Sequence, residues 1–182
     1  MTVHDPRGGG RISPCLSEPA APEPGPRLGG LSARSGLLTP EGYRPIEQLR
    51  QGDLVATMLG RGPRFAPITW IGRRGVHSPQ TMVRVRRDAV GDGMPYRDVV
   101  LAADHALYID GALYPAGRLV NGATLLWDMP ESGPSVWALQ LERHDIVLAD
   151  GLAVETLLHD AARGAYAEVR APRLRVVAGA TR

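Results

Sequence analysis

Two histidine–aspartate pairs are the residues of this chain best suited to chemistry. Asp104 directly precedes His105, and His144 directly precedes Asp145. An imidazole fixed beside a carboxylate can act as a general acid and base, because the histidine pKa lies near neutral pH. We expect each pair to lie at one end of a β-sheet. Two ordinary strand ends would show the same dipeptides, so a purely structural role for both pairs stays open.

The segment around His105 predicts a β-hairpin that would hold this imidazole in place. Two short apolar runs, residues 106–109 and 112–114, flank the dipeptide Asp110-Gly111. A type I′ turn needs two residues that tolerate a positive φ, and Asp-Gly between apolar runs is a strong signal for it. His105 is therefore expected at the start of the first hairpin strand.

The composition predicts one turn-rich domain between two tails. The 182 residues include 22 glycines and 16 prolines, about a fifth of the chain, against a usual share of roughly 12%. Residues 1–30 are rich in both and cannot bury enough apolar surface to offset the entropy of ordering. We therefore expect a disordered tail over residues 1–30, a folded domain over 31–160 and a C-terminal extension over 161–182.

Several classes of function are excluded or disfavoured by the sequence. The single cysteine, Cys15, rules out an internal disulfide and a cysteine-based zinc site, and no glycine-rich phosphate loop precedes a helix. The net charge is only +2, with dispersed arginines, which does not indicate nucleic-acid binding. No apolar run reaches membrane-spanning length, and the N-terminus lacks a signal peptide. We expect no metal, cofactor, nucleic acid or membrane partner, and a chain that is cytoplasmic or exported without a cleaved signal peptide.

Many short apolar runs separated by turns predict an all-β domain. The pattern Pro-x-x-x-Leu-x-x-Gly begins at Pro45 and again at Pro115, 70 residues later, each time after a strand and before another apolar run. This repeat indicates a duplicated β unit related by a pseudo-two-fold axis, although coincidence in a chain rich in proline and glycine is the alternative. Residues 161–170 are expected to form a short helix, and residues 174–177 a last strand.

Five segments in order resemble blocks of the bacterial Hint (hedgehog/intein) domain family. They are residues 39–55 (TPEGYRPIEQLRQGDLV), 68–74 (ITWIGRR), 104–107 (DHAL), 119–122 (LVNG) and 141–151 (LERHDIVLADG). The resemblance covers about residues 31–158. It implies a horseshoe of short β-strands with pseudo-two-fold duplication, which agrees with the repeat found independently.

The resemblance also implies a self-processing chemistry and places its residues. In the family, a cysteine at the first position of the domain attacks the preceding carbonyl, and a Thr-x-x-His motif assists the departure of the amide nitrogen. Carried over by position, the nucleophile falls on Gly30, the threonine on Ala102, and the histidine on His105. Ser32 lies near the nucleophile position but would need a shift in register.

Two functions from different classes follow from this comparison. One is an autoprocessing domain that acts on its own N-terminal segment as an intramolecular substrate, degenerate here because Gly30 has no side chain. The other is a non-catalytic β domain that keeps the fold for binding, as a scaffold, or as a carrier module of a secreted protein. The expected site residues are His105, Asp104, Ser32, His144 and Asp145.

Overall fold

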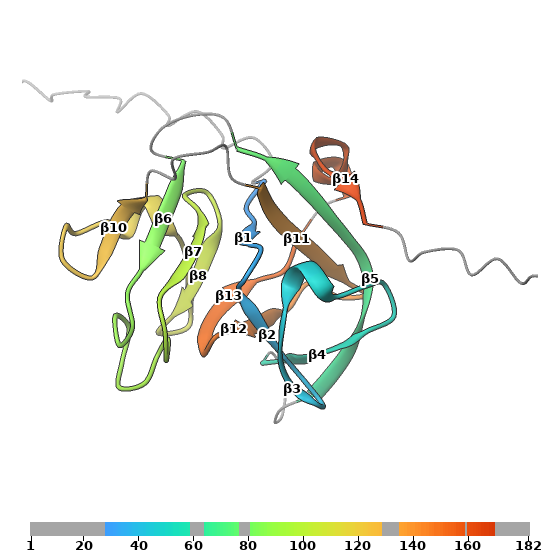
Figure 1. Cartoon of the computed structure of the whole chain (residues 1–182), viewed down its shortest axis with the longest axis horizontal. Helices are drawn as coiled ribbons and strands as arrows, with labels where there is room; N and C mark the ends of the chain where they lie inside the picture. The colour runs from blue at the N-terminus through green and yellow to red at the C-terminus, as the bar shows by residue number, and fades with distance from the viewer. Residues whose placement is uncertain (1–27, 59–63, 77–80, 129–134, 159, 170–182) are drawn as a thin grey trace, which may run out of the picture.

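The computed structural model describes residues 28–58, 64–76, 81–128, 135–158 and 160–169, and every regular element in these ranges is a β-strand or a short 3₁₀ turn. The prediction of an all-β fold is therefore confirmed (Figure 1). The strands are β1 (Leu31–Ser32), β2 (Gly36–Thr39), β3 (Gly42–Pro45), β4 (Leu54–Thr57), β5 (Arg64–Gly75), β6 (Met82–Val85), β7 (Val99–Ala102), β8 (Ala106–Ile109), β9 (Ala112–Pro115), β10 (Leu125–Asp128), β11 (Ser135–Leu141), β12 (Ile146–Ala149), β13 (Leu152–Glu155) and β14 (Ala167–Glu168). The 3₁₀ turns are η1 (Ile46–Gln48), η2 (Ala116–Leu119) and η3 (Asp160–Ala165).

The strands form one continuous, strongly curved antiparallel sheet. Its main path runs β10-β6-β7-β1-β11-β5-β4-β12-β13-β8-β9. The longest pairing joins β5 to β11, from Gly75 opposite Ser135 to Ile68 opposite Leu141. Figure 1 shows β5 bending along one side of the molecule, with β11 beside it. The curvature brings the inner faces of distant strands together over a main buried apolar core, with two smaller buried clusters beside it.

The hairpin turn predicted at Asp110-Gly111, and a second Asp-Gly turn at Asp150-Gly151, have the backbone conformation that this dipeptide favours. Asp110 and Gly111 have φ values of 49° and 85°, and they connect β8 to β9. Asp150 and Gly151 have φ values of 50° and 87° between β12 and β13. Two consecutive positive φ angles define a type I′ turn, whose twist suits the flanking strands. The hairpin that begins directly after His105 is thereby confirmed.

The duplicated unit is confirmed by equivalent strands and equivalent hydrogen bonds. β2 and β3 match β8 and β9 residue for residue at an offset of 70, and η1 and η2 follow at the same offset. The amide of Ile46 donates to the carbonyl of Ser35 (2.8 Å), and the amide of Ala116 donates to the carbonyl of His105 (2.9 Å). Ser35 is therefore the positional equivalent of His105, so the duplication is one of backbone geometry with different side chains.

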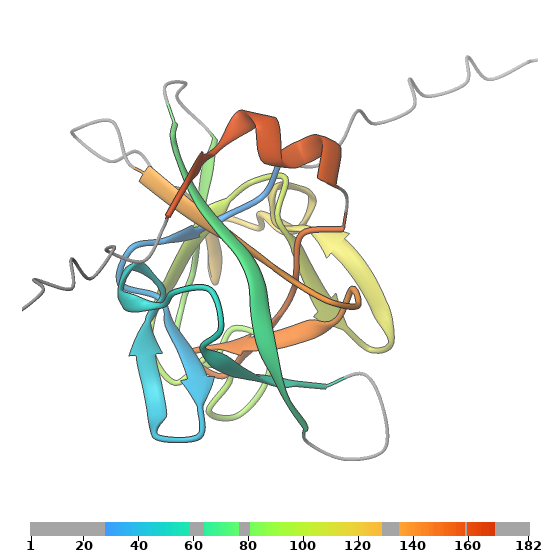
Figure 2. The same cartoon turned by 90° about the vertical axis from the view of Figure 1, so that its right-hand side faces the viewer.

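The C-terminal segment differs from the helix predicted over residues 161–170. It forms η3 and then the strand β14, in which Ala167 lies opposite Arg73 of β5. Gly164 lowers helix propensity here, and pairing with β5 satisfies the backbone groups that follow. Figure 2 shows η3 and β14 at the outer edge of the fold, where β14 pairs antiparallel with β5.

Some sequence expectations concern residues outside the described ranges. The tail up to residue 27, Cys15 within it, and the predicted strand over residues 174–177 belong to this group. Within the described residues, no helix is long and apolar enough to cross a membrane.

Candidate functional site

The site is built around a short strand that carries the start of the folded chain into the sheet. β1 lies between β7 and β11, because Leu31 is opposite both Leu101 and Trp137. The carbonyl of Gly30 accepts a hydrogen bond from the amide of Ala102 (2.8 Å). Residues 28–32 are thus held in the cleft between strands that are distant in sequence.

The peptide bond between Gly29 and Gly30 is hydrogen-bonded at both of its polar atoms. The Gly30 N–H donates to Nδ1 of His105 (2.9 Å). The Gly29 carbonyl oxygen accepts from Nη2 of Arg74 (2.9 Å) and from the hydroxyl of Tyr166 (3.1 Å). A guanidinium and a hydroxyl on a carbonyl oxygen withdraw electron density from the carbonyl carbon. This arrangement polarises the carbonyl and places an imidazole on the amide nitrogen.

His105 is buried and neutral in this position. It lies between β7 and β8 with only 6% of its surface exposed. Burial lowers the pKa of His105, and the nearby charge of Arg74 lowers it further. The carboxylates of Glu155 and Asp104 raise the pKa, but the effect of burial is larger. Because the Gly30 N–H donates to Nδ1, the single proton of the neutral ring must reside on Nε2. The imidazole orientation is therefore fixed by the chain's own N-terminal segment.

Asp104, the other member of this predicted pair, holds the same segment from a different side. One carboxylate oxygen accepts from the amide of Leu28 (3.1 Å), and the other lies 3.7 Å from Nη2 of Arg74. The guanidinium of Arg74 also lies over the ring of Tyr166, at 5.6 Å from its centroid. Burial raises the pKa of the Tyr166 hydroxyl, which stays protonated and able to donate. Asp104, Arg74 and Tyr166 thus hold the backbone of residues 28 and 29.

Gly30, whose amide faces His105, has no space for a side chain. Its φ is +123°, and an ideal Cβ would lie 2.6 Å from Cγ2 and 2.7 Å from Cβ of Val136. Gly29 has a φ of +55°, and a Cβ there would lie 2.7 Å from Nδ1 of His105. Contacts under 3.0 Å require a neighbour to move. Both positions therefore favour glycine in this conformation.

The remaining predicted site residues lie in three different environments. The hydroxyl of Ser32 pairs with that of Ser35 (3.2 Å) and lines a second pocket with Trp137 rather than the one that contains His105. Asp145 accepts hydrogen bonds from the amides of Met58 and Ile146, which is a strand-end role. The structure brings His144, but neither Ser32 nor Asp145, to the pocket beside His105.

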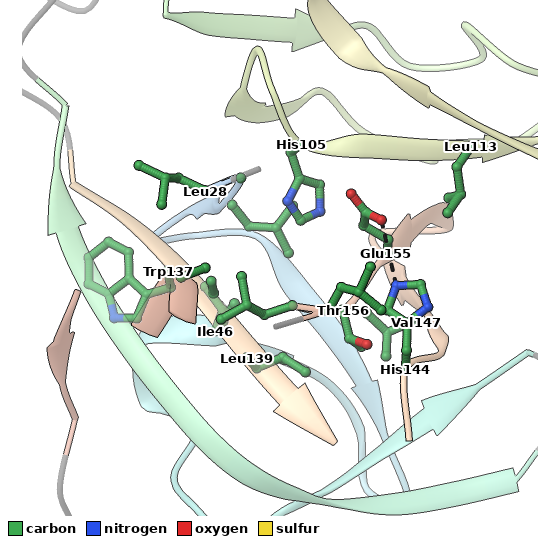
Figure 3. Close-up of a pocket in the computed structure, with 16 residues that line it drawn as sticks. Leu28, Ile46, His105, Leu113, Trp137, Leu139, His144, Val147, Glu155 and Thr156 are labelled. Atoms are coloured by element: carbon green, nitrogen blue, oxygen red, sulfur yellow. Dashed lines mark ion pairs between the residues drawn. The ribbon is translucent and has the colours of Figure 1, made fainter. Parts of the chain in front are cut away.

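A pocket of about 300 Å³ adjoins His105 and the Gly29 backbone. His144 lines it, and Nε2 of His144 lies 3.5 Å from Oε2 of Glu155 in an ion-pair contact. Figure 3 shows the Glu155 carboxylate lying between the two imidazole rings. Leucine side chains form much of the remaining wall. Among the described residues, no group of three or more potential ligands could hold a metal ion.

Sequence reasoning missed four residues of this site: Arg74, Tyr166, Val136 and Glu155. Arg74 belongs to a pair of arginines that looks like a solvated strand face, yet its side chain is only 17% exposed. Arg74 follows the buried positions of β5 at a spacing of two residues, and this spacing was the signal that its side chain is partly buried. Tyr166 approaches Gly29 across 137 residues of sequence, and no local pattern announces that contact.

The sheet and cleft define a class of protein, the Hint domain. A family model for the Hint domain matches residues 30–161, so the chain belongs to that family. Solved structures that resemble it include intein-type domains. The bacterial intein-like domain from Clostridium thermocellum is 15% identical with a TM-score of 0.55, and the match covers 70% of this chain and 97% of that one.

A variant of the Ssp DnaB mini-intein gives a similar result. It is 12% identical with a TM-score of 0.50, and the match covers 72% of this chain and 95% of the mini-intein. At these identities the likeness concerns the fold alone. It confirms the horseshoe fold that the resemblance predicts. No curated protein sequence matches the chain.

Proposed function

We propose that this chain is a Hint domain that holds its own N-terminal segment in the processing cleft without carrying out the acyl shift. One observation carries this proposal: the residue whose N–H donates to His105 is Gly30. The family resemblance puts the nucleophile at the same residue. Sequence position and hydrogen-bond geometry therefore select one residue, and that residue has no atom that can attack.

The acyl shift requires a nucleophile within reach of the Gly29 carbonyl carbon. A thiol or hydroxyl at position 30 would need a Cβ that lies 2.6 Å from Cγ2 and 2.7 Å from Cβ of Val136. The hydroxyl of Ser32 is hydrogen-bonded to Ser35 instead. Ala102, at the threonine position of the motif, has only a methyl group. The chain keeps the scaffold of the processing site but has no nucleophile in it, and both observations support a degenerate site.

The cleft keeps the features that bind a peptide. Leu28, Gly29 and Gly30 each have backbone atoms bound by side chains, and Leu31 is paired on both edges. The N-terminal segment is thus an intramolecular ligand. The proposal keeps a tail over residues 1–30, a Hint domain over 31–160 and a C-terminal extension over 161–182. Tyr166 of this extension contacts the cleft. A carrier module of a secreted protein remains the alternative use of such a domain.

Intact-mass spectrometry tests the proposal directly. We expect the full chain to stay at 19.5 kDa during incubation with dithiothreitol or hydroxylamine, because no ester or thioester forms for either reagent to cleave. Thiol-dependent loss of residues 1–29 would show that a nucleophile operates and would refute the proposal. The variant Cys15→Ser, which lacks the only thiol, provides the matched control because it tells whether Cys15 is that nucleophile.

A further inference from the structure

The pocket beside His105 contains a buried polar atom that makes no hydrogen bond with the described residues. Nε2 of His105 has no hydrogen-bond partner among the described residues, although the atom is fully buried. The Gly30 N–H donates to the opposite nitrogen of the ring, so Nε2 carries the proton and is a donor. A buried donor without an acceptor destabilises the protein, because it has lost its hydrogen bond to water and gained none in return. The pocket therefore offers a hydrogen bond to a bound molecule that brings an acceptor.

The same end of the pocket carries an acceptor and a second imidazole. Nε2 of His144 is buried without a hydrogen bond, since its 3.5 Å contact with Glu155 is an ion-pair distance without hydrogen-bond geometry. Glu155 is close enough to influence the titration of His105. Figure 3 places its carboxylate on the pocket side, between the two rings. This polar end thus presents a donor from His105 next to carboxylate oxygens.

Apart from Thr156, the other side chains that line the pocket are apolar. Leu113, Leu139 and Leu157 line it, together with Trp137. A volume of about 300 Å³ is at the small end of the range for ligand sites. The space suits a short alkyl chain with one polar head rather than a bulky ring system.

We propose that this pocket binds a short-chain aliphatic alcohol without covalent change. The hydroxyl oxygen accepts from Nε2–H of His105, and the hydroxyl proton is donated to the carboxylate of Glu155. The alkyl chain lies against the leucine walls. A fatty carboxylate is disfavoured by repulsion from Glu155, and a nitrile can accept but has no proton to donate. The proposal concerns the uncleaved chain, in which Leu28 and Gly29 line the pocket and the Gly30 N–H leaves the His105 proton on Nε2.

The experiment is a titration of the full uncleaved chain with hexan-1-ol, followed by the ¹⁵N signal of the His105 imidazole in NMR. We expect a saturable shift of the Nε2 resonance, because that atom gains a hydrogen-bond partner. Hexanoate and hexanenitrile, which have the same chain length, should bind at least about tenfold more weakly, because each loses one of two hydrogen bonds. Equal binding of all three compounds would overturn the assignment of the polar end.

Two variants that fill the pocket locate the binding. Leu139→Phe places a larger side chain on the inner wall, and Leu113→Trp does so from a partly exposed position where misfolding is less of a risk. Each should abolish the Nε2 shift. Leu54→Phe, at an exposed position outside the pocket lining, is the matched control and should leave it unchanged. A shift that survives in either folded pocket variant would overturn the proposal, as would the absence of any saturable shift in the unaltered chain.

Discussion

Replacing Gly30 by alanine tests the claim that the cleft has no room for a side chain at the position facing His105. The new Cβ would meet two atoms of Val136 at 2.6 and 2.7 Å. One of them is the Cβ of Val136, which is tied to the backbone of β11 and cannot rotate away. The backbone itself has a φ of +123°, which L-residues rarely adopt.

The expected loss has two parts that a control separates. The unfavourable φ costs about 1–3 kcal/mol, and forcing a methyl group into a filled space costs about 1–3 kcal/mol more. Gly42 has a comparable φ of +106° but nothing within 4 Å of its ideal Cβ. Gly42→Ala should therefore show only the conformational cost. The free energy of unfolding of Gly30→Ala should be lower than that of Gly42→Ala by about 1–3 kcal/mol.

Urea unfolding followed by circular dichroism gives both free energies under one condition. Amide hydrogen exchange at Leu31 then shows where the strain is released, because β1 is the element that must move. Equal stabilities for the two alanine variants would mean that Val136 yields easily to a side chain at position 30. That result would refute the steric argument and weaken the case for a degenerate site.

Two further predictions concern the groups that hold the Gly29–Gly30 peptide. Tyr166→Phe removes one hydrogen-bond donor to the Gly29 carbonyl, while Arg74 still donates to it. Urea unfolding should therefore show that the free energy of unfolding falls by about 1 kcal/mol. The control Tyr114→Phe, at an exposed position, should show almost no change. His105 has a lowered pKa in the folded state; below about pH 6.5 the unfolded chain therefore binds a proton that the folded chain does not. The free energy of unfolding should be level above that pH and should fall below it by up to about 1.4 kcal/mol per pH unit until the folded-state pKa is reached. His105→Gln should flatten this slope in urea unfolding measured between pH 5 and 8.

The amino-acid sequence determined those features that depend on local conformation. Asp110-Gly111 and Asp150-Gly151 specify positive φ angles at two adjacent residues, so both hairpin turns follow from residue type. The repeat of the proline-leucine-glycine pattern at an offset of 70 residues identified the duplicated unit. Ordered motifs also identified the family, because such matches require only the order of residues along the chain, and the resemblance predicts the nucleophile position at Gly30.

Only the tertiary structure decided which side chains surround the Gly29–Gly30 peptide. Arg74, Val136 and Tyr166 come from β5, β11 and the segment after η3, and no sequence pattern relates their distances to Gly29. From sequence alone, Gly30→Cys would be expected to restore the nucleophile, whereas in the structure the Cβ of such a residue would lie only 2.6 Å from Cγ2 of Val136. Contacts of this kind arise when the sheet curves and closes, since packing between strands distant in sequence is fixed by the whole core rather than by neighbouring residues.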